Sequence, residues 1–533
     1  MPILRPSPIL YVGALPDRLP PLSSIPHLPS DLSLLETLEP NQLFRKWDFV
    51  SQFNEDCLKP SQIEPLRFES DELADRVVEE LGFVGHGGSG KDAYLAVKEY
   101  IEDETVKREE GDPVIQFWQE MNKLPPVGVC GFEVKEHGKN SATEKFMPLK
   151  AFEETSAGPT LAEGQRVFWK YSGQIFTALM HFSLAGGFSS PKLAAVMHET
   201  NYLTSDAKEA TYKRLLETTL FVLDAMEDMT VGSGRGWKSA MRVRLLHAQV
   251  RRRISNGKGR YNSYDIERDG IPINQADLLA VLGAFAIGPV WSMTRNGFSM
   301  SPREKSAYQV AWRHVGYYLG ISPSLLLRYY GRSFETTESS FASLAYAVFP
   351  SGEPPKDPYK TPQYKILSSV SGRPPRGKRV EHHLELCRLC VGPSLAEQLA
   401  LPRGEWKDIW TVETERLMGW GLMTFGELYS RYGGKRGKDW EARRRDWFRW
   451  VVKLLVVWQL GERRTVFAWR DEGKHGEKLG LEEGEEADLQ MGPAVGKRVK
   501  AEWKSLLIEM GLVLGTFAAI GGLGLGCAYK ILC

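Results

Sequence analysis

The chain has 533 residues, of which 68 are Lys or Arg and 67 are Asp or Glu, so its formal net charge is only +1. Because a nearly neutral chain has no net basic field to attract phosphate backbones, this composition argues against a nucleic-acid-binding protein. Six scattered cysteines do not suggest a disulfide framework. The length allows either two to four domains or one large helical enzyme with appendages.

The first part of the chain is punctuated by proline and lacks the uninterrupted apolar run of a signal peptide. Residues 1–31 are therefore predicted to form an extended, poorly ordered arm. Residues 85–92, Gly-His-Gly-Gly-Ser-Gly-Lys-Asp, resemble a phosphate-binding loop, but Asp92 stands where a magnesium-binding Ser or Thr is needed. Since no alternating strand and helix pattern follows, a flexible glycine-rich loop is favoured over a nucleotide site.

Two helices are predicted in the middle of the chain. The stretch 206–226 is rich in helix-forming residues and contains neither Pro nor Gly, and the segment 232–236, Gly-Ser-Gly-Arg-Gly, ends it. A second helix is predicted at 237–251. Because the turn between them is short, we expect the two helices to run antiparallel.

The polar side chains on these helices form two groups. Positions 214, 217 and 218 share one face of the first helix, and positions 244, 247 and 251 share a face of the second. The antiparallel arrangement would point the first group toward the second. The two groups are Arg214, Glu217 and Thr218, and His247, Arg244 and Arg251.

An imidazole between apolar residues and guanidiniums has two interpretations. Haem needs a histidine for its iron, an apolar slot for the macrocycle and cations for its propionates. A single histidine on a partly apolar helix is, however, more often a packed core residue. The two helices alone therefore favour the core interpretation of His247 over a haem site.

A resemblance to a known family shifts this balance. Arg214-x-x-Glu217-Thr218, followed about thirty residues later by Leu246-His247 on a basic helix, resembles the pattern of the rubber oxygenase (latex clearing protein) and MpaB family, here its fungal branch. The similarity spans roughly residues 65 to 470. Further phrases that fit the family occur in the same order along the chain, at residues 188–204, 273–277, 312–320 and 387–402.

The resemblance implies a mainly α fold, with a single large helical domain that binds haem b and uses O2. It implies that His247 is the proximal iron ligand and that Arg214 and Thr218 are polar residues on the distal side. Glu217 stands where the rubber-cleaving branch carries a lysine proposed to reach the iron, which puts polymer cleavage in doubt. Glutamate fits the branch related to MpaB, which cleaves a carbon–carbon double bond in a prenyl side chain.

The expected function is therefore a haem-dependent oxygenase that cleaves or oxidises a double bond of a lipophilic, isoprenoid-type substrate. Glu217 is expected to accept an allylic proton or to orient oxygen, with Arg214 holding that carboxylate ionised. The alternative for this pair is an ordinary helix ion pair between positions three apart. Arg244 and Arg251 would hold the propionates, or else lie on a solvated basic face, and Glu199 is a weaker acidic candidate.

An alternative function is a non-catalytic haem-binding or membrane-associated partner protein of the same fold. Replacing the carboxylate of Glu217 discriminates the two, because only the enzyme would lose turnover while keeping its haem.

The end of the chain predicts a membrane anchor. Residues 510–529 are uncharged and mostly apolar, and a helix of that length spans about 30 Å, the thickness of the hydrocarbon layer. Residues 506–530 are therefore predicted to form a transmembrane helix, rather than a buried glycine-rich helix. Four cations precede the apolar stretch 510–529 and only Lys530 follows that stretch, which places the large domain in the cytosol, and the endoplasmic reticulum is the expected membrane.

The remaining boundaries follow from composition. We expect one helical domain at 32–470 with a long surface loop at 351–379, and a charged linker at 471–505. The basic, tryptophan-rich stretch 443–458 is expected to be the last core helix of the enzyme, although a helix on the membrane surface fits its composition as well. Cys387 and Cys390 are expected to be two buried thiols rather than a zinc or redox site.

Overall fold

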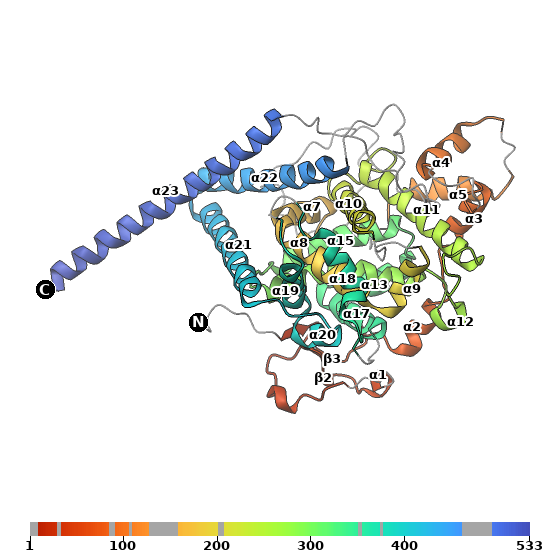
Figure 1. Ribbon diagram of the computed structural model, residues 1–533, viewed down its shortest axis with the longest axis horizontal. Coiled ribbons are helices and arrows are strands. Elements are labelled where there is room, and N and C mark those ends of the chain that lie inside the picture. Colours follow the sequence, from red (N-terminus) through yellow and green to blue (C-terminus); the bar gives the residue numbers. More distant parts are fainter. Residues whose placement is uncertain are drawn as a thin grey trace. The chain divides into compact units, whose positions relative to one another are not determined.

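The computed structural model divides the chain into two compact units (Figure 1). The first comprises residues 1–412 with 465–481, and the second comprises 413–464 with 482–533. The predicted single domain at 32–470 is therefore wrong at its C-terminal end, because the division falls inside a long helix. The structure describes residues 9–28, 34–84, 91–105, 109–126, 158–200, 207–349, 354–373, 377–460 and 493–532.

The first unit is mainly α-helical, as expected. Its N-terminal half contains α1 (Leu34–Thr37), α2 (Pro60–Leu66), α3 (Glu72–Glu80), α4 (Ala93–Glu102), α5 (Pro113–Met121), α7 (Leu161–Lys170), α8 (Ser172–Ala178), α9 (Pro191–Thr200), α10 (Lys208–Ala225) and α11 (Arg235–Ser255). Its C-terminal half contains α12 (Ile266–Asp269), α13 (Gln275–Ala286), α14 (Gly288–Arg295), α15 (Pro302–Tyr318), α16 (Pro323–Tyr330), α17 (Phe334–Val348), α18 (Pro362–Val370), α19 (Val380–Val391) and α20 (Pro393–Gln398). Short helical turns lie at Leu22–Ser24, Gly187–Ser189 and Pro358–Lys360, and a π-helix lies at Leu179–Gly186.

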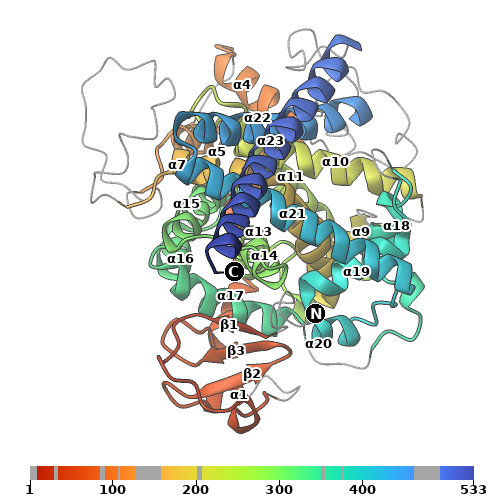
Figure 2. The ribbon, with the colours of Figure 1, turned by 90° about the vertical axis from the view of Figure 1, so that its left-hand side faces the viewer.

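A small sheet was not foreseen in the sequence. Strand β1 (Leu10–Val12) pairs in parallel with β3 (Phe49–Gln52), which pairs antiparallel with β2 (Leu43–Lys46), so the strand order is β1-β3-β2 (Figure 2). Within the predicted arm, Leu10–Val12 is thus extended but not poorly ordered. The side chains of Leu10 and Val12 are buried, because the strand adds an apolar edge to the sheet beside α14 and α17.

The two predicted central helices are α10 and α11, and they pack against each other. A Cβ atom on Gly236 would lie 2.6 Å from the carbonyl oxygen of Asp224, so the start of α11 approaches the end of α10 at a distance that only glycine allows. Trp237, fully buried one residue later, donates from Nε1 to the carbonyl oxygen of Met121. These contacts therefore fix α10 and α11 relative to each other at the turn that joins them.

Asp92 has a structural role that explains why it interrupts the phosphate-loop pattern. Its carboxylate accepts the backbone N–H of Tyr94 and so caps α4. It also accepts two hydrogen bonds from Arg242 of α11, at 2.8 and 2.7 Å. The residues before it, 85–90, lie outside the described residues.

Among the residues that the structure describes, Gln275–Arg295 is the stretch long and apolar enough to cross a membrane, and 78% of its apolar window is buried inside the protein. This stretch comprises α13 and α14, which contact the π-helix and α17. These contacts make it a core element of the first unit.

The predicted loop at 351–379 is also only partly correct. Pro362–Val370 forms α18, which Thr361 caps through its hydroxyl, and this helix packs against both α10 and the π-helix. The proline at the first helical position, which was taken as a sign of a loop, is compatible with a helix start.

The second unit consists of α21 (Trp406–Tyr432), α22 (Gly434–Leu460) and α23 (Pro493–Leu532), of which α21 begins in the first unit. Its core contains Phe425, Trp440 and Leu506 from the three helices. The stretch 443–458 therefore belongs to this unit and not to the enzyme core. The charged linker predicted at 471–505 is wrong from Pro493 onward, because α23 starts there and continues through the predicted helix at 506–530.

Candidate functional site

Three polar side chains of α10 lie together. Arg214 donates from Nη1 to Oε2 of Glu217 at 2.8 Å, and Oγ1 of Thr218 donates to the carbonyl oxygen of Arg214 at 3.1 Å. The carboxylate of Glu217 is buried, with only 3% of its side chain exposed. A buried carboxylate held by one guanidinium has a fixed orientation, which an ordinary surface ion pair does not have.

His247 of α11 has an unsatisfied ring nitrogen in the protein interior. Its Nδ1 atom is buried and has no hydrogen-bond partner. Burial lowers the pKa of His247 to about 4, and the neighbouring charge of Arg251 adds to this effect while Asp71 opposes it. The imidazole is therefore neutral at pH 7, which is the form that binds a metal.

Arg244 and Arg251 differ in their partners. Arg244 donates to both carboxylate oxygens of Asp71, at 2.6 and 3.0 Å, and lies 2.8 Å from Glu120. These two carboxylates satisfy its guanidinium, so Arg244 joins α11 to α3 and α5. A propionate would have to displace one of them.

The positive charge of Arg251 is not fully offset by carboxylates, unlike that of Arg244. It is 98% buried and comes within 3.4 Å of Asp75, but its Nε and Nη1 atoms make no hydrogen bond. Burial raises the pKa of Asp75 to about 6, although Arg251 pulls it down, so the two charges compensate each other only in part. A buried guanidinium with unsatisfied donors is a place for an anionic group.

Both arginines are buried, so the solvated-face alternative for them is wrong. The structure brings the six predicted residues into two clusters on packed helices, one on α10 and one on the face of α11 that meets α3.

Glu199 is not a catalytic base. Its carboxylate accepts the backbone N–H groups of Tyr261, Asn262 and Ser263 at 2.8 to 3.0 Å, and the hydroxyl of Ser263 at 2.6 Å. Burial alone would raise its pKa, but these four donors lower it. The side chain therefore holds the loop after α11 in place and has no proton-accepting oxygen left over.

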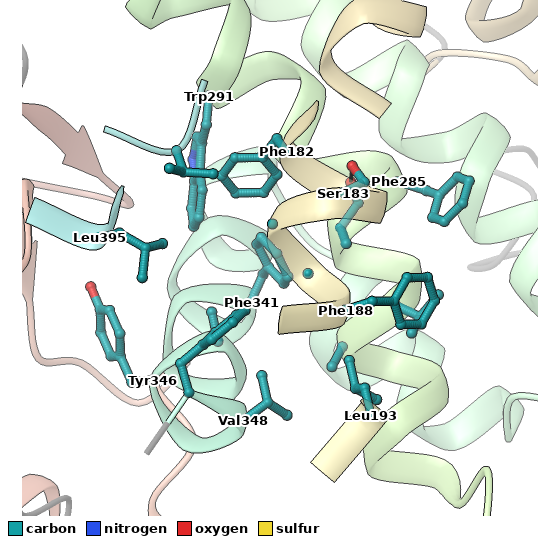
Figure 3. A pocket seen from close by; sticks show the side chains of 18 of the residues that line it. Phe182, Ser183, Phe188, Leu193, Phe285, Trp291, Phe341, Tyr346, Val348 and Leu395 are labelled. Carbon is teal, nitrogen blue, oxygen red and sulfur yellow. Dashed lines mark hydrogen bonds between the residues drawn. The ribbon is translucent and has the colours of Figure 1, made fainter. Parts of the chain in front are cut away.

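An apolar pocket of about 50 Å³ lies between the π-helix, α13, α14, α17 and the small sheet (Figure 3). Phe182, Trp291 and Phe341 form its walls, together with the small side chains of Ala284 and Ala345. The hydroxyl of Ser183 at the edge of the pocket donates its hydrogen bond to the backbone carbonyl oxygen of Ala284 and so is not available to a ligand. A narrow, dry cavity of this kind suits hydrocarbon rather than water.

The π-helix itself, and a histidine pair on it, were missed in the sequence. The Nε2 atom of His181 lies 3.1 Å from the Nδ1 atom of His383 in α19. The Nδ1 atom of His181 lies 2.8 Å from the carbonyl oxygen of Thr177. The thiol of Cys387 donates to the carbonyl oxygen of His181. A π-helix frequently marks a functional region, but its mostly apolar local sequence gives no signal of the extra residue.

Cys387 and Cys390 are buried, unpaired thiols, as expected. Burial raises the pKa of Cys390 to about 12 and that of Cys387 well above its ordinary value, so neither is a ready nucleophile. In the part of the chain that the structure describes, no three His, Cys, Asp or Glu side chains gather in a metal-binding arrangement.

Comparison with known proteins identifies the domain that carries these residues. Residues 169–426 match the family described as "ER-bound oxygenase mpaB/B'/Rubber oxygenase, catalytic domain". Residues 169–426 are assigned to this family. The protein is thus an oxygenase, and α10, α11, the π-helix and the apolar pocket's helices all fall within the matched segment.

A solved structure titled as latex clearing protein in the closed state is similar to this oxygenase, with 15% sequence identity and a TM-score of 0.43. The similarity covers 83% of this chain and 91% of that one. Among curated proteins, none matches the sequence.

The buried His181 makes stability depend on pH in a defined way. Burial lowers the pKa of His181 to about 4, against an ordinary value of 6.5, so the unfolded chain takes up a proton that the folded one does not. The free energy of unfolding should therefore fall as pH drops from 6.5 to 4, by roughly 3 kcal/mol for this group. In His181→Gln, this part of the pH dependence should be absent in denaturant titrations, whereas curves that stay parallel would contradict the buried neutral imidazole.

Proposed function

We propose that this oxygenase holds haem b through His247 and uses O2 to cleave a carbon–carbon double bond of a lipophilic, isoprenoid-type substrate. The observation that carries the proposal is the neutral imidazole of His247, whose buried Nδ1 has no hydrogen-bond partner among the described residues, one helical turn from the incompletely neutralised guanidinium of Arg251. A metal ion and an anionic carboxylate are the two partners that these groups lack. Haem b brings both.

His247 and Arg251 fit the binding of haem b, whereas Arg244 does not. His247 supplies a neutral nitrogen for the iron, and Arg251 supplies donors for one propionate. Arg244 does not fit the second propionate, because Asp71 and Glu120 already satisfy it. Its contribution is to fix α11 against α3, and so to hold the helix from which His247 and Arg251 project.

Haem b, when bound, supplies the dioxygen binding and the redox chemistry. The chain's own acid–base group is Glu217. Its buried carboxylate is oriented by Arg214 and can accept a proton from an allylic carbon or orient a polar reactant by hydrogen bonding. Because glutamate has no amine to offer to iron, the substitution of lysine by Glu217 favours a proton-transfer role and a prenyl side chain over polymer cleavage.

The apolar pocket is proposed to receive part of the hydrocarbon chain of the substrate. Its aromatic walls and small alanines leave a narrow slot, which suits an unbranched or methyl-branched chain. None of its lining residues lies on α10 or α11, so it would bind the remote part of a long substrate rather than the reacting double bond. Binding energy from such a remote part supports reaction at the other end.

Membrane attachment is proposed through α23. Its last part, residues 510–529, is uncharged, and Lys497, Arg498, Lys500 and Lys504 precede it, so the large unit would lie on the cytosolic side. The words "ER-bound" in the family's description support the endoplasmic reticulum as the membrane. A lipophilic substrate dissolved in that membrane would lie within reach of the enzyme.

Glu217→Gln tests the catalytic role. With an isoprenoid alkene such as squalene as substrate, turnover should fall by roughly 100-fold or more, because the amide cannot accept a proton, while haem content stays the same. Glu209→Gln on the same helix is the matched control, since its side chain is 80% exposed, and it should leave turnover unchanged. Full activity in Glu217→Gln would remove this residue from the reaction and would favour a non-catalytic role for the buried ion pair.

Ala284→Leu tests the pocket. The larger side chain would fill the narrow cavity, so kcat/KM for a long isoprenoid should fall by about ten-fold while a five-carbon alkene is affected little. Ala194→Leu, at a polar cleft on the other side of α9, is the matched control. Equal losses for long and short substrates would show that the pocket does not select chain length.

A further inference from the structure

Helix α21 carries an exposed row of large apolar side chains. Trp406 and Trp410 are about two-thirds exposed, at 67% and 66%, and Leu428 is 53% exposed. The row recurs at intervals that keep it on one face of the helix. Its members, called the tryptophan row below, are Trp406, Trp410, Leu417, Trp420 and Leu428.

The tryptophan row is not the core-facing side of α21. The side chains that pack in the second unit are Leu422, Phe425 and Tyr429, which contact Trp440 and Leu506. The helix therefore has two apolar faces, one buried in its own unit and one exposed. A row of exposed tryptophans of this extent marks an interaction surface.

The charge of the second unit indicates the kind of partner. The second unit, residues 413–464 and 482–533, contains seventeen Lys and Arg against fourteen Asp and Glu, a net charge of +3. Because the whole chain carries +1, the remaining residues carry −2. A net positive charge and exposed tryptophans together are typical of a surface that binds a membrane with anionic lipids.

The core-facing side of α21 is attached to α23. Oη of Tyr429 donates to Oε1 of Glu509 at 3.0 Å, so the end of α21 is attached to α23 at the residue before its uncharged stretch begins. Beyond this contact, Leu512 and Leu514 of α23 are at least half exposed. Figure 1 shows α23 continuing away from α21 and α22 toward the C-terminus.

We propose that α21 is an interfacial helix, whose tryptophan row lies between the headgroups and acyl chains of the membrane that α23 enters. This inference rests on the membrane attachment proposed above. The tryptophan rings occupy the boundary between water and hydrocarbon, and the cations of α22 and α23 face anionic headgroups. α21 then holds the second unit against the membrane surface, whereas α23 alone would only tether it.

A fluorescent label on the row tests this in the full chain. Cys130, Cys527 and Cys533 are changed to serine, while the buried Cys57, Cys387 and Cys390 stay. A nitrobenzoxadiazole group is attached at Leu417→Cys and, as the matched control, at Tyr359→Cys in the first unit, where the native side chain is 59% exposed. Both chains are reconstituted in vesicles of phosphatidylcholine and phosphatidylserine, and flotation shows whether they are bound.

The label at position 417 should react with dithionite, a water-soluble reductant, about ten-fold more slowly than the label at 359, and doxyl-labelled lipid should quench only the former. Equal reaction rates in a chain that floats with the vesicles would overturn the interfacial helix and leave the anchor standing. Protection from dithionite without quenching by lipid would mean that protein covers the row, which also overturns the proposal. A chain that does not float would sink the membrane attachment and this inference together.

Discussion

The burial of four arginines on α11 is the constraint on which the oxygenase unit depends. Arg242, Arg244, Arg251 and Arg253 are each at least 94% buried, and a buried cation needs a carboxylate to offset its lost hydration. Asp92 at the start of α4 and Asp71 at the start of α3 provide paired hydrogen bonds to the first two. Removing one partner of such a pair typically costs about 3–5 kcal/mol, so these pairs determine how α3, α4 and α11 fit together.

Arg251 differs from Arg242 and Arg244 because no carboxylate among the described residues makes paired hydrogen bonds to its guanidinium. Arg251 has a carboxylate nearby but keeps two unsatisfied donors, and His247, one turn before it, keeps an unsatisfied nitrogen. Unsatisfied buried polar groups are costly. A metal-bearing, anionic cofactor would complete both groups on this face of α11. The same helix thus carries Arg242 and Arg244, which are paired with carboxylates, and also His247 and Arg251, which keep unsatisfied atoms.

Local features of the sequence were predictable, and long-range partners were not. The helices α10 and α11, and the grouping of Arg214 with Glu217, follow from helix propensity and from the spacing of three residues. That Arg244 binds Asp71 depends on a contact across 173 residues, which no local pattern contains. For the same reason the sequence suggested a propionate for Arg244 and a catalytic role for Glu199, whose actual partners are a distant loop's backbone N–H groups.

The errors in the fold have similar causes. Leu10–Val12 lies among prolines and was therefore predicted to be part of an unstructured arm. Three residues are nevertheless enough to form an edge strand, because β3 offers them backbone hydrogen bonds. The division inside α21 was missed because the helix is continuous across it, so neither proline nor glycine marks the boundary. The π-helix was missed because one extra residue in an apolar helix changes the backbone hydrogen bonds without changing the composition.

The most direct test of the central claim is the visible spectrum of the purified full chain after incubation with haemin, in its oxidised, reduced and carbon-monoxide-bound forms. The account predicts one haem per chain, with a Soret band that shifts with carbon monoxide in the wild type and is lost in His247→Ala, while Arg251→Gln binds haem more weakly. A wild-type chain that binds no haem would contradict the account. So would a His247→Ala variant that binds it in full.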